Sequence, residues 1–427
     1  MDQLYQYYLR YRRVITDSRK VEPGAIYFAL KGANFDGNDF VSAALTAGCS
    51  LAVTDRPELN GTDGTYFVPD VLEALQKLAS MHRERTGIKI VAITGSNGKT
   101  TTKELIAAVL STGMKVWYTQ GNLNNHIGVP LTILAMPEDT DLLVLEMGAN
   151  HPGEIKFLSE LARPDYGLIT NIGKAHLEGF GSFEGVKKAK AELYDFLAAN
   201  GGKAFLNRDN KVLGSVIGSC PVALGYGKDA DVIAADAVAD PFLSFTWQRD
   251  EVSYKVRTKL TGIYNLENAL AAITIGLFFG ISPENINRAL EAYMPANHRS
   301  QMVETNRNRV VLDAYNANPS SMKVALDNFL AMKGEGKLII LGGMKELGAE
   351  SRSEHQVLVD RLRNEFSGEC YLVGSEFEAL GPIPRQWIHF SSTESLLGHL
   401  KKNAPENKLI LLKGSRSNCL ELAMQYL

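Results

Sequence analysis

Apolar residues along this chain gather in short continuous runs that alternate with stretches of amphipathic pattern. Residues 25–30, 89–94 and 142–146 form such runs, which are typical of strands buried on both faces of a sheet. Residues 71–85 and 183–200 carry apolar side chains at intervals of three and four, which predicts amphipathic helices. Strands that alternate with helices in this order predict a parallel sheet covered by helices on both faces.

The same alternation continues through the middle of the chain. Residues 166–170 are a further strand candidate, residues 230–260 predict more polar extended strands, and residues 265–279 predict a helix. The longest largely apolar run, residues 269–281, is shorter than the roughly 20 residues that cross a bilayer. We therefore interpret it as part of a buried helix and expect no membrane insertion.

A second series of strands and helices follows residue 300. Its strand candidates are residues 310–312, 338–341, 371–373 and 409–412, with helical patterns between them. This series predicts a second doubly wound unit, and it lacks the G-x-G-x-x-G fingerprint of a dinucleotide site. The segment 295–299, Pro-Ala-Asn-His-Arg, is the predicted linker between the two series.

Composition narrows the class of protein. The 427 residues carry a net charge of −3, so we expect no nucleic-acid partner, and the length suggests two or three domains. The N-terminus lacks the apolar core of a signal peptide. The chain has 4 cysteines without C-x-x-C spacing, which predicts buried free thiols rather than disulfides or zinc. Together these features predict a cytoplasmic protein of the size of an enzyme.

The strongest chemical signal is the segment Thr-Gly-Ser-Asn-Gly-Lys-Thr-Thr at residues 94–101, between a predicted strand and a predicted helix. Backbone N–H groups at such a turn converge, and the helix terminus adds roughly half a positive charge, which suits a polyphosphate. Lys99 would reach the outer phosphates and Thr100 would ligate magnesium. The predicted nucleotide-binding residues of this loop are Gly95, Ser96, Asn97, Gly98, Lys99, Thr100 and Thr101.

The loop departs from the strict G-x-x-x-x-G-K-[ST] pattern, because Ile93 stands where that pattern has glycine. The alternative is an ordinary glycine turn before a helix. Glu146, at the end of the apolar run 142–146, is a weak signal alone because many strands end in an acid. Together with the loop it predicts a second half of the nucleotide site, with a carboxylate for magnesium.

Several segments in this order resemble the Mur ligases, which are ATP-dependent enzymes of bacterial cell-wall synthesis. The short loop is also typical of folylpolyglutamate synthases. The segments that carry the resemblance are Gly95–Thr101, Glu146–Asn150, Asn171–Leu177, Ala189–Glu192 and Gly262–Ala269. The resemblance spans nearly the whole chain. It implies an α/β fold of three domains, with a central P-loop-type parallel-sheet ATPase domain and a C-terminal Rossmann-like doubly wound domain. We place these domains at residues 1–86, 87–296 and 297–427.

Other segments resemble the family member that adds D-alanyl-D-alanine to UDP-N-acetylmuramoyl-tripeptide. They are Asp17–Gly24 with Phe28–Gly32, Asp313–Pro319 and Lys413–Ser417. The resemblance implies that ATP phosphorylates the terminal carboxylate of the tripeptide and that the amine of D-alanyl-D-alanine attacks the acyl-phosphate. Two positions depart from the family pattern: Gly343 replaces the usual aspartate, and His298-Arg299 replaces Gly-Arg. We also expect a monomer.

The resemblance assigns roles in catalysis and magnesium binding. Lys99, His176 and Lys190 are the implied catalytic residues. Thr100, Glu146, His176 and a carbamylated Lys190 are the implied ligands of magnesium ions. Alternatively, His176 is a hydrogen-bonded structural residue. Lys190 falls on the apolar stripe of the helix 183–200, where an ammonium is costly to bury. The alternative for Lys190 is that its head extends to solvent.

The remaining implied contacts concern the nucleotide and the other substrates. Asn265 would contact adenine, Asp313 the ribose and Arg299 a phosphate. A helix N-cap is the alternative for Asn265. Ser18 and Arg19 would hold the UDP end, with a solvated turn as the alternative. Asn125, preferred over His126, would contact substrate, and Ser415 and Arg416 would hold the dipeptide.

Two other functions compete with this interpretation. One is a different amide ligase, either the preceding Mur enzyme or a folylpolyglutamate synthase. The Asp313–Pro319 segment and the N-terminal segments argue against both. The other is a catalytically silent nucleotide-binding protein that kept the fold. The joint presence of Lys99, Thr100, Glu146, His176 and Lys190 argues against it.

Overall fold

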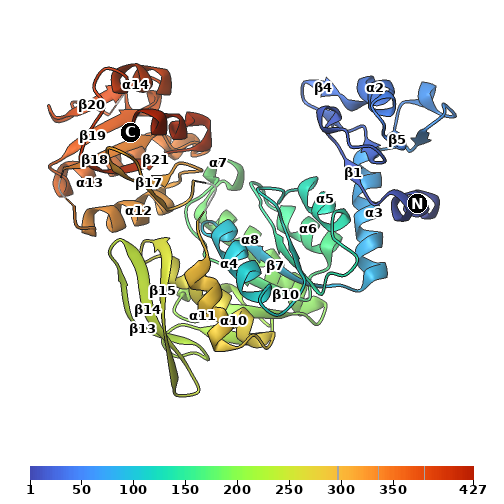
Figure 1. Cartoon of the computed structure of the whole chain (residues 1–427), viewed down its shortest axis with the longest axis horizontal. Coiled ribbons are helices and arrows are strands. Elements are labelled where there is room, and N and C mark those ends of the chain that lie inside the picture. The colour runs from blue at the N-terminus through green and yellow to red at the C-terminus, as the bar shows by residue number, and fades with distance from the viewer. Residues whose placement is uncertain (296–297, 335, 379) are drawn as a thin grey trace.

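The computed structural model describes residues 1–295, 298–334, 336–378 and 380–427. It has three α/β units arranged as two arms above a central body, with the N-terminal unit in one arm and the C-terminal unit in the other (Figure 1). The expected α/β class, with a parallel central sheet and a second doubly wound sheet, is confirmed. Among the described residues no helix is both long and apolar enough to cross a membrane.

The N-terminal unit is built on a small parallel sheet with strand order β1-β2-β5-β6. Its elements are α1 (Asp2–Tyr11), β1 (Val14–Ile15), β2 (Ile26–Phe28), β3 (Lys31–Gly32), β4 (Phe35–Asp36), α2 (Val41–Thr46), β5 (Leu51–Thr54), β6 (Thr65–Phe67) and α3 (Val71–Thr86). Asp70 caps α3 by accepting a hydrogen bond from Glu73 N, and Gly87 ends it in the left-handed conformation.

Helices α1 and α3 fasten this unit to the central body. Tyr8 Oη donates to Leu134 O at 2.9 Å, and Arg83 Nη2 lies 2.9 Å from Asp165 Oδ2 in a largely buried ion pair. The small sheet itself stands away from the rest of the molecule (Figure 1).

The central unit holds a six-stranded parallel sheet of order β12-β11-β10-β7-β9-β8. Its strands are β7 (Lys89–Thr94), β8 (Val116–Tyr118), β9 (Leu142–Glu146), β10 (Tyr166–Ile169), β11 (Lys203–Asn207) and β12 (Val222–Tyr226). Its helices are α4 (Lys99–Leu110), α5 (Gly128–Leu134), α6 (Glu154–Ala162), α7 (Leu177–Phe180), α8 (Phe183–Ala199), α9 (Lys211–Val216), α10 (Asn265–Phe278) and α11 (Pro283–Ala292).

The topological switch point of this sheet lies between the neighbouring strands β7 and β10, since the chain runs from β7 to β8 on one side and from β10 to β11 on the other. In open α/β sheets the crevice at the carboxyl ends of such strands is the usual ligand site. The expected polar strands of residues 230–260 form an antiparallel sheet, β13 (Ile233–Ala239), β14 (Phe242–Arg249) and β15 (Val252–Thr261).

The C-terminal unit has a six-stranded sheet of order β16-β17-β21-β18-β19-β20, parallel except for the edge strand β16. Its elements are β16 (Gln301–Glu304), β17 (Arg309–Asp313), α12 (Pro319–Ala331), β18 (Lys337–Gly342), α13 (Ser351–Glu365), β19 (Glu369–Val373), β20 (Trp387–Phe390), α14 (Thr393–Leu400) and β21 (Leu409–Lys413). The predicted domain boundary at residues 296 and 297, with part of the predicted linker 295–299, lies outside the described residues.

The cysteine prediction was correct in part. All four thiols are free, and Cys49, Cys220 and Cys370 are buried. The prediction that all would be buried was wrong for Cys419, which is exposed between the two short 3-10 helices that follow β21.

Candidate active site

A cavity of about 980 Å³ opens at the carboxyl ends of β7 and β9, where the central unit meets the C-terminal unit. Most of the predicted site residues line it: Ser96, Asn97, Gly98, Lys99, Thr100, Thr101, Asn125, Glu146, His176, Asn265, Arg299 and Asp313. Gly95, Ser18, Arg19, Lys190, Ser415 and Arg416 do not line it. The fold therefore gathers residues from two units around one space large enough for a nucleotide.

The phosphate loop occupies the turn between β7 and α4. Gly98, with φ 79°, precedes the first helical residue Lys99, and a Cβ on Gly98 would meet Asn268 Oδ1 at 2.7 Å. Glycine is thus required there both by the backbone conformation and by space. Lys99 Nζ donates to Gly95 O at 2.6 Å, so the ammonium is folded back onto its own loop. Burial lowers the pKa of Lys99 to about 8.

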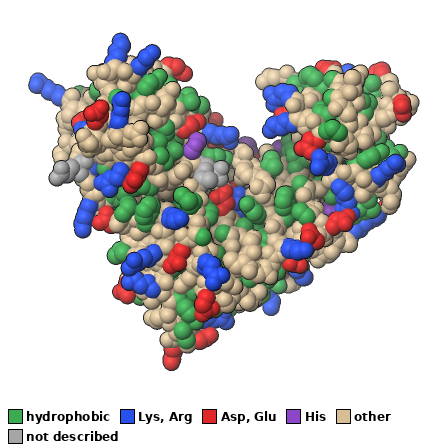
Figure 2. Space-filling model, viewed as in Figure 1, with side chains coloured by type: hydrophobic (Ala, Val, Ile, Leu, Met, Phe, Trp, Pro, Cys, Tyr) green, Lys and Arg blue, Asp and Glu red, His purple; other side chains and the backbone are tan. Residues whose placement is uncertain are grey.

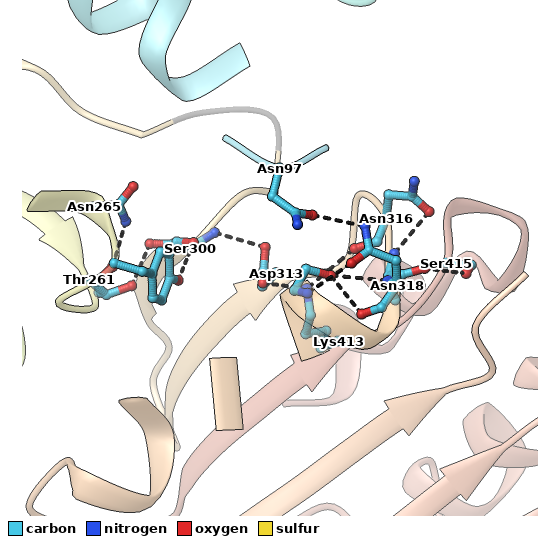
Figure 3. Close-up of polar contacts among 12 residues, drawn as sticks. Asn97, Thr261, Asn265, Ser300, Asp313, Asn316, Asn318, Lys413 and Ser415 are labelled. Carbon is cyan, nitrogen blue, oxygen red and sulfur yellow. Dashed lines mark hydrogen bonds and ion pairs between the residues drawn. The ribbon is translucent and has the colours of Figure 1, made fainter. Parts of the chain in front are cut away.

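Asparagine side chains hold this loop in place. Asn97 N donates to Asn171 Oδ1 at 3.0 Å, and Asn171 Nδ2 donates back to Asn97 O at 3.1 Å. Thr170 Oγ1 also donates to Asn97 O, at 2.6 Å. From the C-terminal unit, Asn318 Nδ2 donates to Asn97 Oδ1 at 2.8 Å (Figure 3). Thr170, Asn171 and Asn318 were not among the predicted site residues.

Glu146 ends β9 with its side chain buried at the cavity wall. Its Oε1 accepts a hydrogen bond from Asn124 Nδ2 at 2.7 Å, whereas Oε2 accepts none in the described protein. Lys103 Nζ lies 3.7 Å from Oε2, and burial lowers the pKa of this fully buried lysine. Sequence reasoning missed Lys103 and Asn124, although Lys103 follows Lys99 by one helical turn and so shares its face of α4.

The donors around Glu146 fit a hard cation. Thr100 and Glu146 both line the cavity, and a carboxylate oxygen such as Oε2, which accepts no hydrogen bond in the described protein, is the type of ligand that Mg²⁺ prefers. Across the described residues, no three His, Cys, Asp or Glu side chains converge on one point. A magnesium site here would therefore have to draw on hydroxyl, phosphate or carbamate oxygens as well.

His176 sits in a left-handed conformation, φ 52°, just before α7. Its Nδ1 lies 2.5 Å from Oε2 of Glu346, a residue of the C-terminal unit, and this close contact lowers the pKa of Glu346. His176 thus has the polar partner expected of a structural histidine and also lines the cavity.

Lys190 lies on the buried stripe of α8 with Val186 and Leu193, as its spacing predicted. Only 1% of the residue is exposed, so the alternative in which its head reaches solvent is wrong. Its Nζ donates to Ala149 O at 3.4 Å and lies 5.4 Å from the Phe180 ring centroid. Burial, with repulsion from Lys99 as a smaller cause, lowers the pKa of Lys190 to about 7. Ala149 lines the cavity, so the amine lies directly behind its wall.

Asn265 is buried at the start of α10. Its Nδ2 donates to Thr261 O at 2.7 Å (Figure 3), and its Oδ1 accepts from Asn268 Nδ2 at 2.8 Å. The helix N-cap alternative is wrong, because Tyr264 occupies the N-cap position and Asn265 is already helical.

Asp313 and Arg299 face the cavity from the C-terminal side. Asp313, at the end of β17, accepts from Ser300 N at 3.2 Å and lies 2.6 Å from the buried Lys413 Nζ (Figure 3). Arg299 stacks on the Tyr315 ring, 3.7 Å from its centroid, and its buried Nε has no hydrogen-bond partner in the described protein. Lys413 lies in the segment Lys413–Ser417 that carries the family resemblance, but no role was predicted for it.

Other predicted substrate residues lie outside the cavity. Arg19 is in the N-terminal arm, with 87% of its side chain exposed, and its Nε lies 2.9 Å from Asp17 Oδ1. The hydrogen bonds from Arg19 lower the pKa of Asp17 to about 2. Ser18 adjoins Arg19 in the same short helix. Figure 2 shows an open notch between this arm and the C-terminal arm. Closure of the arms would be needed to bring Ser18 and Arg19 to the cavity.

The predicted dipeptide residues are beside the cavity. Ser415 is buried, and its Oγ accepts from Lys345 N at 3.0 Å. Arg416 lies 5.4 Å from the centroid of the Tyr315 ring. Asn125 lines the cavity but directs its Oδ1 to Ile127 N, at 3.1 Å, and to Gly128 N within its own loop.

Comparison with known families gives three matches along the chain. Residues 10–83 match the model described as Mur ligase family, catalytic domain. Residues 93–276 match the Mur ligase middle domain, and residues 298–416 match the Mur ligase, glutamate ligase domain. The matches follow the order of the three structural units.

Full-length relatives and structures agree with these matches. UDP-N-acetylmuramoyl-tripeptide–D-alanyl-D-alanine ligase of Bacillus subtilis is 37% identical, over 96% of this chain and 91% of the relative. The Escherichia coli enzyme of the same name is 37% identical, over 96% and 92%. A crystal structure of MurF from Acinetobacter baumannii aligns with a TM-score of 0.88 and 32% identity, covering 97% of this chain and 92% of that one. MurF ligase from Thermotoga maritima in complex with ADP aligns with a TM-score of 0.86 and 28% identity, covering 98% and 97%.

Proposed function

The chain belongs to the Mur ligase family, and we propose that it joins D-alanyl-D-alanine to UDP-N-acetylmuramoyl-tripeptide with conversion of ATP to ADP, in peptidoglycan precursor synthesis. The observation that carries the proposal is the shared cavity. The phosphate loop of the central unit and the Asp313–Asn318 segment of the C-terminal unit face each other across it. Phosphoryl transfer and amide formation can therefore use one space.

The reaction has two steps. A carboxylate oxygen of the tripeptide attacks the γ-phosphorus of ATP, the bond to ADP breaks, and an acyl-phosphate forms. The neutral amine of D-alanyl-D-alanine then attacks the acyl carbon. The C–O bond to phosphate breaks, the amide forms and the amine proton leaves to solvent. Such chemistry needs positioned reactants and compensation of negative charge more than covalent help from side chains.

Lys99 is the mobile charge in this proposal. Its ammonium, which rests on Gly95 O, would turn toward the outer phosphates, while the N–H groups at the start of α4 bind phosphate oxygens. Arg299 would contact a phosphate, Asn265 the adenine and Asp313 the ribose. The unpaired Nε of Arg299 supports an anionic partner, because a buried N–H without an acceptor is costly.

We propose that Thr100 and Glu146 hold one magnesium ion, and that Glu146, His176 and a carbamylated Lys190 surround a second. The carbamate oxygen can act through water. The buried Oε2 of Glu146, which accepts no hydrogen bond in the described protein, supports this assignment. Bound magnesium would neutralise charge on the transferring phosphoryl group. Glu146 and His176 would orient their donor atoms from the cavity wall, with His176 held by Glu346.

The remaining substrate contacts follow from the same proposal. Ser18 and Arg19 would hold the UDP end, Asn125 the substrate near the reacting carboxylate, and Ser415 and Arg416 the dipeptide. Since Ser18 and Arg19 lie outside the cavity, substrate binding would draw the N-terminal arm toward it. Closure would also exclude water that hydrolyses an acyl-phosphate. We further propose a cytoplasmic monomer with domains at residues 1–86, 87–296 and 297–427.

The decisive experiment measures phosphate release by the purified chain with ATP, magnesium, UDP-N-acetylmuramoyl-tripeptide and D-alanyl-D-alanine, omitting each in turn. We expect release only with the full set, and a product whose mass equals the sum of both substrates minus water. ATP binding with no turnover would instead support the silent nucleotide-binding alternative, and phosphate release without the dipeptide would contradict a reaction that needs both substrates. Running the assay with lysine-containing and diaminopimelate-containing tripeptides identifies the accepted third residue.

A further inference from the structure

One side-chain hydrogen bond joins the phosphate loop to the C-terminal unit. Asn318 Nδ2 donates to Asn97 Oδ1 at 2.8 Å, between residues 221 positions apart in the sequence. Figure 3 shows the side chain of Asn97 pointing toward Asn318, with a dashed line that marks this bond. Asn318 is 8% exposed, so little water competes for this bond.

The direction of the bond is fixed by the other role of Asn318. Asn318 is the N-cap of α12, where its Oδ1 accepts from Ser321 N at 2.8 Å. Its backbone N in turn donates to Ser321 Oγ at 3.0 Å, which completes a capping box. Because the oxygen is committed to the cap, the amide NH₂ group must face Asn97, and Asn97 must present its oxygen.

The backbone of Asn97 is also held by hydrogen bonds, from the central unit. Its backbone N–H and C=O both bond to residues that follow β10, with Asn171 Oδ1 as the acceptor and Thr170 Oγ1 and Asn171 Nδ2 as the donors. Asn97 therefore connects the two units, since its main chain forms hydrogen bonds with the segment after β10 and its side chain forms one with the N-cap of α12. A shift of α12 would be transmitted to the loop that faces the phosphates.

A second contact beside the bridge keeps α12 in place. Lys174 N donates to Ser320 Oγ at 3.0 Å, and Lys174 Nζ pairs with Glu354 Oε1 at 2.6 Å. The N-terminus of α12 thus rests on the segment that follows β10, which is the segment that also holds Asn97. These contacts exist only while the C-terminal unit is docked on the central unit.

We propose that Asn318 is a positioning residue that couples docking of the C-terminal unit to the geometry of the phosphate loop. The inference rests on the proposed ligase function. In the docked state Asn318 holds Asn97, and the loop has its transfer-competent shape. In the undocked state the loop loses this restraint, so phosphoryl transfer is slow until the unit that brings the acceptor is in place. This order protects ATP and the acyl-phosphate from water.

The test is a double-mutant cycle with Asn97→Ala and Asn318→Ser. Serine keeps the N-cap of α12 but cannot supply the amide donor. Each single variant should lower kcat about two- to tenfold, the range for one buried hydrogen bond, and the double variant should lose no more than the worse single one. Asn210→Ser is the matched control, because Asn210 caps α9 through Val212 N and Leu213 N away from the cavity. Losses that multiply in the double variant would overturn the proposal.

Two further readouts separate positioning from general damage. ADP affinity in the absence of acceptor should change less than kcat in Asn318→Ser, because the backbone donors of the loop remain. An equal loss of both would contradict the coupling. Hydrogen exchange of residues 95–101 in the substrate-free chain should be faster in Asn318→Ser than in Asn210→Ser or the unmodified chain. This measurement needs no ligase activity, so it tests the bridge even if the proposed function fails, and unchanged exchange would refute it.

Discussion

The carboxylate of Glu376 fills the space that a side chain on Gly343 would need. A Cβ built on Gly343 would lie 2.6 Å from Glu376 Cδ, and one on Gly374 would lie 2.6 Å from Glu376 Oε2. The same carboxylate forms an ion pair with Lys345. Gly343 is where this chain departs from the aspartate usual in Mur ligases, and its φ is not in the positive range that requires glycine. An acid from residue 376 therefore stands where the family pattern has one on residue 343.

This relationship predicts a compensating pair of substitutions. Gly343→Asp alone should lower the free energy of unfolding by about 1–3 kcal/mol, because the new side chain overlaps Glu376 and repels its charge. Glu376→Ala alone should free Lys345 and lower kcat. The double variant Gly343→Asp, Glu376→Ala should recover most of both losses. Urea unfolding and steady-state ligase assays measure the two effects.

The control for this pair is Gly398→Asp, since a Cβ on Gly398 meets nothing within 4 Å. It should not respond to Glu376→Ala. If the double Gly343/Glu376 variant is no better than the worse single one, residue 376 does not replace residue 343.

The fold was predictable where the signal is local. Continuous apolar runs located β7, β9, β18 and β21, because strands buried on both faces need such runs. The phosphate loop was predictable for the same reason, since its glycines and Lys99 are neighbours in sequence. Lys413 and Asp313, by contrast, are 100 residues apart, and nothing in either segment indicates the ion pair.

The residues predicted to hold the UDP end show a second limit of prediction from sequence. Arg19 is on an exposed turn of the N-terminal arm, and the motif around it indicates a binding role without fixing where the arm stands. The arrangement of whole units depends on interfaces such as Arg83 with Asp165, which no periodic pattern reveals. Sequence patterns therefore predicted the members of the site better than their arrangement.

Lys99→Ala should leave a folded protein with almost no ligase activity. The ammonium would be a preorganised charge at the outer phosphates, and losing such a contact costs about a hundredfold to a thousandfold in rate. Phosphate release measures the rate, and thermal unfolding checks the fold. Lys188→Ala, which removes an exposed lysine of α8, is the control and should keep full activity. Turnover of Lys99→Ala within a few-fold of the control would disprove the assigned role.

The acceptor should be D-alanyl-D-alanine and not a single amino acid. We expect the dipeptide to support phosphate release while glutamate and free L-lysine do not, because the C-terminal segments 313–319 and 413–417 resemble those of the dipeptide-adding member. The measurement is initial phosphate release at saturating ATP and tripeptide with each acceptor. A preference for glutamate would favour the folylpolyglutamate synthase alternative.

Lys190 should act as a carbamate and not as an amine. With its pKa lowered to about 7 by burial, the amine is mostly neutral above pH 7, and the neutral form is the one that adds carbon dioxide. As pH falls below 7 the ammonium returns, carbamate is lost and activity should fall, with partial protection by added bicarbonate. Because Nζ contacts Ala149, which lines the cavity, a carbamate on Nζ would lie beside the cavity.

Substitution gives the sharper test of this carbamate. Lys190→Ala removes both the amine and the anion it would carry, so activity should fall to background. Formate or acetate should restore part of it, because a small carboxylate can enter the space left by the side chain and supply two oxygens to a hard cation.

Lys188→Ala, four positions beyond Glu184 on the exposed side of the helix, should neither lose activity nor respond to acetate. Rescue should depend on acid size, with formate and acetate effective and butyrate not, since the space is bounded by Phe180 and Ala149. An active Lys190→Ala would exclude the carbamate, and His176 and Glu146 would then act without it. The same conclusion would follow from an intact-mass spectrum, recorded under conditions that preserve carbamates, that lacks the addition of carbon dioxide, about 44 Da.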